Sequence, residues 1–311
     1  AQLLVIDEAQ KVPNIGTALK LVVDNIEDIF VIATGSSSFD LSNATGEALT
    51  GRKNILTLFP LAIDELRASQ SVYDIERNLP DFLTYGMYPN IRTYKNSADK
   101  EGRLKEITNS YLITDILEFQ KVKSAKPIID LLRLLAFQVG SEVSSVELGV
   151  SLGLDNKTIL RYLDLLEKSF ILFRLDGFSK NLRKEVSKMS KYYFCDIGVR
   201  NTLIANYNDL DKRNDVGSLW ENFLIMERVK KNTYNGLAVN YYFWRTYDQK
   251  EIDLIEERGG ALYGYEIKWG EKKAVAPKDW SNTYPDANFE VINQKNYLDF
   301  ISTQSQTKPK K

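Results

Sequence analysis

Four side chains in the C-terminal third of the chain have the types and spacing of a metal-assisted phosphodiester-cleaving site. Within KEIDLIEERGGALYGYEIKWG (250–270), Glu251 and Asp253 lie two residues apart, and so do Glu266 and Lys268. Residues two apart on a strand share a face. Two carboxylates with a lysine suit this chemistry: Asp253 and Glu266 would hold Mg²⁺ or Mn²⁺, and Lys268 would position or deprotonate a water.

A hairpin must bring these groups together. The stretch 240–270 predicts two or three strands around a turn at Gly259–Gly260. The preceding helical pattern, 217–231, offers Glu221 as a third acidic ligand, and Glu227 is a substitute that we expect to be the more buried of the two. Alternating charges on a hairpin are also typical of a solvated sheet face, and that interpretation stays open.

A second group of chemically capable residues opens the chain, where the apolar run of LLVIDEAQ leads into Asp7 and Glu8. In nucleotide-hydrolysing α/β domains, an acidic residue after such a strand holds Mg²⁺ and a neighbouring residue orients the attacking water. We assign these roles to Asp7 and Glu8. Thr34 or Ser36, at the polar end of the run IFVIATGSSS (29–38), could contact the γ-phosphate of ATP.

The segment GEALTGRK (46–53) is similar to a phosphate-binding loop but is not one. Arg52 replaces the lysine, Lys53 replaces the hydroxyl residue, and the segment does not join a strand to a helix. Arg52 is instead a candidate arginine finger or sensor, which would act on a nucleotide held by a neighbouring copy in a homo-oligomer. No other segment offers backbone N–H groups for the β- and γ-phosphates. We therefore expect the chain to be part of a longer protein and not to hydrolyse ATP by itself.

The elements around the acidic pair follow a parallel α/β pattern. An apolar run at 3–8, a helix-like stretch at 12–26 and the run at 29–38 predict strand, helix and strand with short connections. A third apolar run covers 54–61, and residues 62–125 have a mainly helical period that is broken at YGMYPN. The acidic pair alone would equally suit the start of a surface helix.

The middle of the chain predicts a helix-turn-helix followed by a wing. Two helical patterns within 144–175 flank a turn at Gly153, and a strand follows at once. The second helix should turn its apolar residues to the core: Ile159, Leu160, Leu163 and Leu166. The candidate DNA contacts are basic residues of this helix and of the run after the strand: Lys157, Arg161, Lys180, Arg183, Lys184, Lys188 and Lys191. Nearby acidic residues leave a packing or protein-contact module as the alternative.

Composition limits the chemistry further. The 311 residues, 43% hydrophobic and 27% charged, indicate a globular protein of two or three domains. Histidine is absent and Cys195 is the only cysteine, so histidine-based triads, zinc sites and an internal disulfide are excluded. The net charge of −1 gives no overall attraction to nucleic acid or membrane. With no apolar run near ~18 residues and no signal-peptide pattern, we expect a cytoplasmic protein without a membrane span.

The order of these features resembles the bacterial and archaeal AAA-type ATPases that carry a C-terminal domain of unknown function. The resemblance continues through YGMYP, TILRYLDLLEKSFILFRL, KYYFCDIG and ENFLIMERVKK. It implies a core that uses ATP and Mg²⁺, then a winged helix and a nuclease-like module. Residue by residue, Glu221, Asp253, Glu266 and Lys268 match the pattern of the PD-(D/E)xK restriction-endonuclease-like fold.

The expected fold class is therefore α/β. It combines a partial P-loop NTPase core of the AAA type (1–70), a helical segment (71–125), a winged helix (126–185), a restriction-endonuclease-like α/β domain (186–305) and a disordered tail (306–311). One hypothesis is an ATPase whose C-terminal domain binds or cleaves DNA. The alternatives are an ATP-dependent regulatory or protein-interaction protein with an inactive nuclease-like scaffold, and a DNA-binding module that needs no metal.

Overall fold

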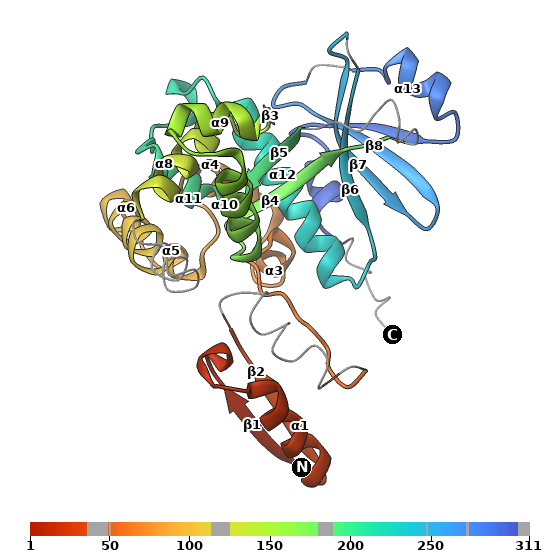
Figure 1. Ribbon diagram of the computed structural model, residues 1–311. Coiled ribbons are helices and arrows are strands. Elements are labelled where there is room, and N and C mark those ends of the chain that lie inside the picture. The colour runs from red at the N-terminus through yellow and green to blue at the C-terminus, as the bar shows by residue number, and fades with distance from the viewer. Residues whose placement is uncertain are drawn as a thin grey trace.

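The computed structural model describes residues 1–35, 49, 51–112, 125–179, 189–246, 248–271 and 274–303. Figure 1 shows a small N-terminal unit and a larger body that contains the other helices and strands. Some predicted site residues and the predicted tail lie outside the described residues: Ser36, Lys180, Arg183, Lys184, Lys188 and 306–311.

The N-terminal unit is a parallel strand–helix–strand unit, as the sequence predicts. β1 (Gln2–Ile6) pairs with β2 (Ile29–Ala33), and α1 (Ile15–Asn25) connects the two strands. One face of this small sheet packs on Ile15 and Leu19 of α1. This placement brings the carboxyl ends of both strands to the same edge, where Asp7 and Thr34 follow.

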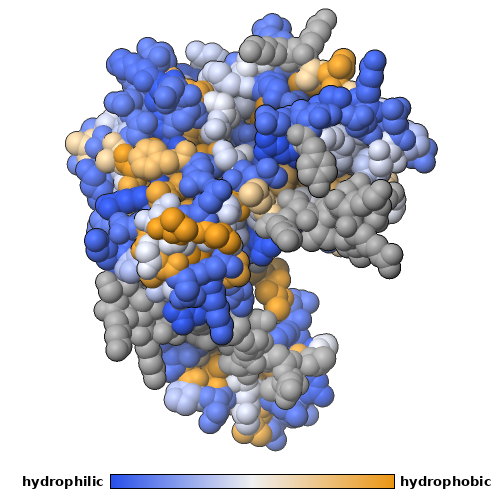
Figure 2. Space-filling model, turned by 45° about the horizontal axis from the view of Figure 1, so that its top comes forward, coloured by the Kyte–Doolittle hydropathy of each residue, from blue (hydrophilic) through white to orange (hydrophobic). Residues whose placement is uncertain are grey.

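The other face of this sheet is apolar and exposed to solvent. Its side chains alternate along the two strands: Leu3, Val5, Phe30 and Ile32. Figure 2 shows orange, apolar atoms at the surface of this unit. The third apolar run forms no strand, because residues 53–59 have no strand partner, and Leu56 and Leu58 are each 91% exposed.

The next segment is helical, as its period predicts. Its elements are α3 (Ile63–Arg67), α4 (Val72–Tyr85), α5 (Pro89–Arg92), α6 (Ser97–Glu106) and the π-helical turn η2 (Ile107–Leu112). Side chains cap the starts of the two longer helices: the Ser71 hydroxyl and the Asn96 amide oxygen each accept a backbone N–H. The break at YGMYPN separates α4 from α5.

Three helices, a short strand and an antiparallel hairpin follow. They are α8 (Lys126–Phe137), β3 (Glu142–Val143), α9 (Ser145–Leu152), α10 (Asn156–Lys168), β4 (Leu172–Gly177) and β5 (Ser190–Phe194). The turn between α9 and α10 needs Gly153, which ends α9 with φ 65°, and Asp155 caps α10 by accepting the Thr158 N–H. β5 pairs antiparallel with both β3 and β4.

The C-terminal part continues the same sheet. Its elements are α11 (Ile197–Leu203), the 3₁₀ turn η3 (Leu210–Lys212), α12 (Val216–Tyr234), β6 (Asn240–Arg245), β7 (Glu251–Arg258), β8 (Ala261–Ile267), α13 (Lys278–Thr283), β9 (Asn288–Ile292) and α14 (Tyr297–Ile301). The seven strands lie in the order β3-β5-β4-β6-β7-β8-β9. β6, β7 and β8 are antiparallel neighbours, and the turn between β7 and β8 lies at Gly259–Gly260 as predicted, with φ of 57° and 77°.

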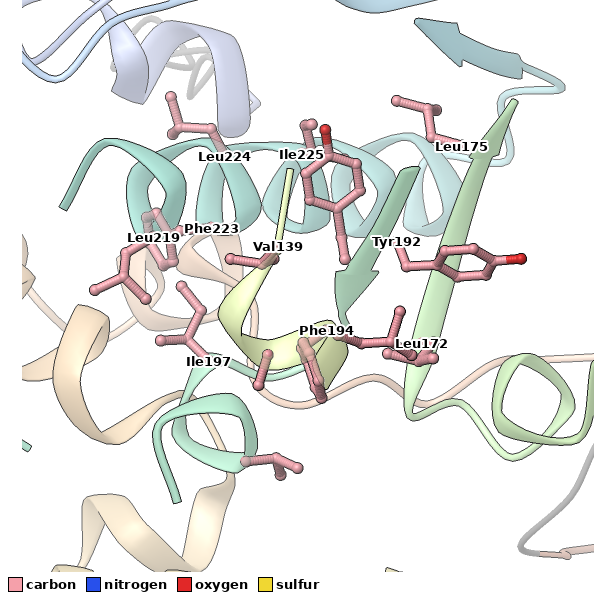
Figure 3. Close-up of a cluster of buried hydrophobic side chains, with 14 of the residues drawn as sticks. Val139, Leu172, Leu175, Tyr192, Phe194, Ile197, Leu219, Phe223, Leu224 and Ile225 are labelled. Atoms are coloured by element: carbon pink, nitrogen blue, oxygen red, sulfur yellow. The ribbon is translucent and has the colours of Figure 1, made fainter. Parts of the chain in front are cut away.

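One large hydrophobic core extends through much of the larger body, beside two smaller clusters around Trp280 and Ile91. It contains buried residues from Ile63 of α3 to Ile301 of α14, with α12 at its centre. Figure 3 shows side chains of α12, such as Leu219 and Phe223, near those of β4, β5 and α11. The three units predicted after residue 70 thus share one core, and the boundaries between them stay predictions.

Two glycines allow the break after α4 to lie directly against the start of α11. The Asp196 carboxylate accepts the Met87 N–H (2.6 Å) and the Val199 N–H (3.2 Å), so it joins the two segments. A Cβ on Gly198 would collide with the Tyr85 carbonyl, and one on Gly86 would collide with Asp196. Gly86 also has φ +74°, which favours glycine.

We expect Gly198→Ala to lower the free energy of unfolding by about 1–3 kcal/mol, the usual range for overpacking a tight interior contact. Urea unfolding followed by circular dichroism measures this loss. Gly217→Ala is the matched control, because its Cβ would meet no atom within 4 Å and it lies in helix α12. The free energy of unfolding of the control should be unchanged or slightly higher than that of wild type, because alanine favours a helix more than glycine does. Equal stability of both variants would contradict the close approach seen at Gly198.

Candidate functional site

The predicted acidic residues of the C-terminal part come from three elements that meet at one end of the sheet. Asp253 lies near the start of β7 and Glu266 near the end of β8, one residue beyond the paired Leu254 and Tyr265. Glu221 lies near the start of α12. The antiparallel hairpin therefore places Asp253 and Glu266 side by side, as the turn position predicts.

Lys268 connects the two carboxylates. Its ammonium nitrogen lies 2.5 Å from Glu266 Oε1 and 3.9 Å from Asp253 Oδ2, so these oxygens are no farther apart than the sum of the two distances. Asp253 Oδ2 also accepts the backbone N–H of Ile267 (2.6 Å). The structure thus brings Asp253, Glu266 and Lys268 together on one face, in the arrangement expected from their spacing.

Two residues of β5 complete the cluster, and sequence reasoning did not assign them to it. The Tyr193 hydroxyl donates to Glu221 Oε1 (2.6 Å). The Lys191 ammonium lies 3.7 Å from the same oxygen and forms an ion pair with Glu251. We predicted Lys191 as a DNA phosphate contact, and this is wrong because its side chain is 2% exposed. The sequence did contain a signal for this grouping. In the strand-like stretch KYYF, side chains alternate between the two faces, so Lys191 and Tyr193 share one face.

Glu227 does not reach this cluster. It is more buried than Glu221, as expected, but it accepts the Ile63 N–H (2.7 Å) and pairs with Lys230 (2.7 Å). These contacts fix the start of α3 to α12. Of the two alternatives for a third acidic group, only Glu221 lies with Asp253.

Burial and mutual repulsion raise the pKa values of the clustered carboxyl groups. Burial, together with the Asp253 charge, raises the pKa of Glu221 to about 8. Burial also raises the pKa of Asp253 and of Glu266, although Lys268 opposes the shift in both. Burial disfavours the charged form of Lys191, but Glu221 and Glu251 more than offset this and its pKa is raised. Glu221 therefore retains its proton at neutral pH.

The raised pKa of Glu221 predicts how stability depends on pH. The unfolded carboxyl ionises near 4.5 and the folded one near 8, so the folded state binds more protons between these values and loses stability as pH rises through this window. Glu221→Gln removes this loss. Relative to wild type, the variant should be more stable at pH 9 than at pH 4, by about 1.4 kcal/mol for each unit by which the pKa of Glu221 is raised.

Denaturant unfolding at the two pH values measures this difference. Glu271→Gln is the control, because Glu271 is 70% exposed and outside the cluster, and it should follow wild type at both pH values. A Glu221→Gln effect that is the same at pH 4 and pH 9 would contradict a raised pKa at this position.

One carboxylate oxygen of the site is buried without a partner among the described residues. Glu266 Oε2 is buried and has no hydrogen-bond partner, whereas Oε1 contacts Lys268. A buried carboxylate oxygen without a partner is costly unless a water or cation binds it. Among the described residues, no group of three or more acidic, histidine or cysteine side chains is arranged to hold a metal ion. Asp253 and Glu266 instead fit the way Mg²⁺ is commonly held, by one or two carboxylates with water as the other ligands.

The predicted nucleotide residues lie at the carboxyl edge of the small sheet. The Thr34 hydroxyl donates to Asp7 Oδ1, and the Thr34 carbonyl accepts the Ala9 N–H (2.8 Å), so the strand ends are joined. Glu8 has φ 51°, and its carboxylate accepts from the Gln10 side-chain amide (2.9 Å). Asp7, Glu8 and Thr34 are therefore neighbours, while Ser36 lies outside the described residues.

Arg52 lies away from these residues. It forms an ion pair with Asp24, in the last turn of α1, where the chain returns to the amino end of β2. The arginine is thus at the opposite end of the small sheet from Asp7. This position does not bring Arg52 to the nucleotide residues of its own chain, and its action on a neighbouring copy stays a prediction.

The predicted DNA-contacting residues of α10 are exposed. Lys157 and Arg161 both project from the first half of this helix, and the opposite face packs Ile159, Leu163 and Leu166 into the core. Leu160 was expected in the core but is 49% exposed, because its position on the helix turns it toward the polar face.

Three known families match separate stretches of the chain. Residues 1–67 match an AAA domain, residues 76–210 match a domain of unknown function (DUF8612), and residues 216–295 match a domain of unknown function (DUF4143). An AAA domain followed by a C-terminal domain of unknown function is the order that the sequence resemblance implies. No solved structure matches the chain significantly.

Uncharacterized proteins of bacteria and archaea are similar to most of the chain. One from Mycobacterium tuberculosis is 28% identical over 86% of this chain, and one from Haemophilus influenzae is 26% identical over 75%. One from Methanocaldococcus jannaschii is 23% identical over 94%. The aligned region spans 58%, 57% and 67% of these proteins, respectively. In the described part of the chain, no helix is long and apolar enough to cross a membrane.

Proposed function

We propose that the chain is part of an AAA-type ATPase whose C-terminal α/β domain binds DNA and cleaves phosphodiester bonds with Mg²⁺ or Mn²⁺. The observation that carries this proposal is the convergence of Asp253, Glu266 and Lys268 at one end of the sheet, with Glu221 beside Asp253. The match of residues 1–67 to an AAA domain supports the ATP-dependent part. ATP and Mg²⁺ would bind near Asp7, with Glu8 orienting water and Thr34 or Ser36 near the γ-phosphate.

The element order supports a nuclease-like C-terminal domain. Helix α12 precedes the antiparallel strands β6, β7 and β8, and α13 then leads to β9, which pairs parallel to β8. This order is consistent with the PD-(D/E)xK resemblance of the sequence. A divalent ion held by Asp253 and Glu266 would polarise the phosphodiester and lower the pKa of a bound water.

The preceding segment supports DNA binding through a winged helix. Helices α8, α9 and α10 are followed by the β4–β5 hairpin, and the short β3 pairs with β5. In such a module the second helix of the helix-turn-helix reads DNA. Here that helix is α10, and its exposed Lys157 and Arg161 would contact phosphates, with Lys180, Arg183 and Lys184 as further candidates.

The direct test is cleavage of DNA by the chain in the presence of Mn²⁺. Duplex, single-stranded and branched DNA should each be offered, and nicking should require the metal. Asp253→Asn should abolish nicking because it removes a charged ligand. Asp279→Asn is the control, because Asp279 is half-exposed and its carboxylate pairs with Lys250, which is not one of the clustered residues. Cleavage that survives in Asp253→Asn would overturn this assignment.

A second function is an ATP-dependent regulatory or protein-interaction protein with an inactive C-terminal scaffold. The observation that favours it is the set of lysine–carboxylate contacts within the cluster, which already satisfies several of the acidic groups. Isothermal titration calorimetry with Mn²⁺ separates the two functions. A chain that neither binds Mn²⁺ nor nicks any of the three DNA forms would favour the scaffold.

A further inference from the structure

A groove on the larger body is lined by segments that are distant in sequence, and none of its lining residues belongs to the acidic cluster. Its volume is about 440 Å³, within the range of small-ligand sites. The lining comes from α4, from η3 and from the residues that follow β8 and β9. Part of it is apolar, with the side chains of Leu79, Pro80, Leu210 and Trp269. Two acidic residues, Glu76 and Asp211, also line the groove.

The two carboxylates of the groove have no counter-ion in the described part of the chain. Neither Glu76 nor Asp211 forms an ion pair or a side-chain hydrogen bond with another described residue. Lys212 follows Asp211 in the sequence but pairs with Asp209 (2.7 Å). Arg77 follows Glu76 but does not line the groove. Two uncompensated negative charges therefore favour a cation in the groove and repel phosphate groups, so nucleic acid does not suit it.

A buried hydroxyl beside the groove also lacks a partner. Tyr297 of α14 is 2% exposed, and its hydroxyl has no hydrogen-bond partner among the described residues. The pKa of this hydroxyl is raised by burial and by the negative charge of Glu76, so the hydroxyl lies on the Glu76 side of its ring. An unpartnered buried hydroxyl is costly. A donor that enters the groove beside Glu76 can reach the hydroxyl oxygen directly or through one water.

Trp269 is held in place at the groove by other aromatic rings. It packs edge-on against Trp220, with ring centroids 5.3 Å apart, and Trp220 packs in the same way against Tyr297, at 5.1 Å. Trp220 is fully buried, whereas Trp269 is only partly buried and keeps contact with the groove. Of the aromatic side chains, tryptophan attracts a cation over its ring most strongly.

The mixture of acidic and apolar groups decides which kind of cation suits the groove. Mg²⁺ keeps several waters and prefers oxygen ligands in octahedral geometry, which apolar walls do not supply. An organic cation uses both parts of the lining. Its charge pairs with the carboxylates and lies against the indole ring, while its aliphatic stem covers the apolar side chains.

We infer that this groove binds an organic cation, an ammonium or guanidinium group on an aliphatic stem, with its charge at Glu76 and Asp211 and its stem along Trp269. Free polyamines and the lysine or arginine side chains of a partner polypeptide share this chemistry. Because the groove shares no residue with the acidic cluster, it stands or falls separately from the proposed nuclease site.

The test titrates two probes into the whole chain by isothermal titration calorimetry at low salt. One probe is spermidine, and the other is a capped hexapeptide of alternating lysine and alanine. Saturable binding with a Kd of ~1 mM or below is expected, since each exposed ion pair and the cation–π contact contribute modestly. The same peptide with norleucine in place of lysine should not bind, because it keeps the stems and lacks the charges.

Variants locate the binding at the groove. Glu76→Gln with Asp211→Asn should weaken binding by ~10-fold, and Trp269→Leu by ~3-fold. Tyr297→Phe should melt no lower than wild type, because it removes an unpartnered polar group, and should bind the probes more weakly. Glu147→Gln with Asp164→Asn is the matched control. It removes two exposed carboxylates from α9 and α10, which do not line the groove, and should bind like wild type.

The two probes separate the two sources of the cation. Binding of spermidine alone assigns the groove to a free polyamine, and binding of the peptide alone assigns it to a partner polypeptide; both support an organic-cation site. Absence of saturable binding by both probes would overturn the site. So would equal binding of the norleucine peptide, or affinities that are the same in the Glu76→Gln, Asp211→Asn double variant and in wild type. Glu76 and Asp211 are exposed, so this double variant should fold, and circular dichroism checks that it does.

Discussion

Replacing Lys268 with alanine should slow Mn²⁺-dependent DNA nicking by at least ~10²-fold, the lower range for losing a proton-transfer or charge-stabilising group. The ammonium group lies between the carboxylates of Asp253 and Glu266, where a water attacking a phosphodiester would be activated. Its positive charge would also stabilise the extra negative charge of the transition state. Both effects are lost in the variant, so the rate constant should fall more than the affinity for DNA.

Metal binding distinguishes a role in catalysis from a role in structure. Removing the ammonium group makes the site more negative, so Lys268→Ala should bind Mn²⁺ at least as tightly as wild type. Lys295→Ala is the control, because Lys295 forms an exposed ion pair with Glu271, and it should cleave at the wild-type rate. Nicking by Lys268→Ala within ~3-fold of wild type would remove Lys268 from the reaction and leave it as a counter-ion of the two carboxylates.

The parts of the site that lie close in sequence were predictable because local geometry decides them. The alternation of the strands and the glycine turn determine which side chains share a face, so Asp253, Glu266 and Lys268 could be grouped before the fold was known. The parallel unit at the N-terminus is equally local. Its helix is short enough to return the chain directly to the neighbouring strand, which brings Asp7 and Thr34 to one edge.

The parts contributed by distant segments were not predictable from spacing. Lys191 follows a basic run in the sequence, and such runs are typical of DNA-binding segments. However, β5 packs beside α12, so the side chain of Lys191 lies in the acidic cluster. The choice between Glu221 and Glu227 depends on which face of α12 meets β5 and which meets α3. Both faces of this helix are buried, so the sequence contains no polar stripe that would separate the two.

Replacing Arg228 with alanine should lower the free energy of unfolding by about 3–5 kcal/mol, the loss expected when one member of a buried ion pair is removed. The guanidinium group of Arg228 binds both oxygens of Glu256, at 2.7 and 2.9 Å, and donates to the Phe300 carbonyl at 2.6 Å. Glu256 is 0% exposed, so the variant would leave its charge buried with weaker partners. The same pair connects α12, β7 and α14, and its loss should loosen the sheet that positions Asp253.

A double variant tests whether the loss comes from the buried charge of Glu256, which would keep only the partly exposed Arg258 as an ion-pair partner among the described residues. Arg228→Met with Glu256→Gln removes both charges while it keeps most of the side-chain volume, so it should be clearly more stable than Arg228→Met alone. Lys250→Ala is the control for an exposed pair, in which both partners are about half-exposed, and it should cost at most about 1 kcal/mol. Urea unfolding of the four variants and of wild type gives the comparison. If Arg228→Ala were no more costly than Lys250→Ala, the buried pair would not stabilise the junction of α12, β7 and α14, and the rigidity of the acidic site would have to come from the hydrophobic core alone.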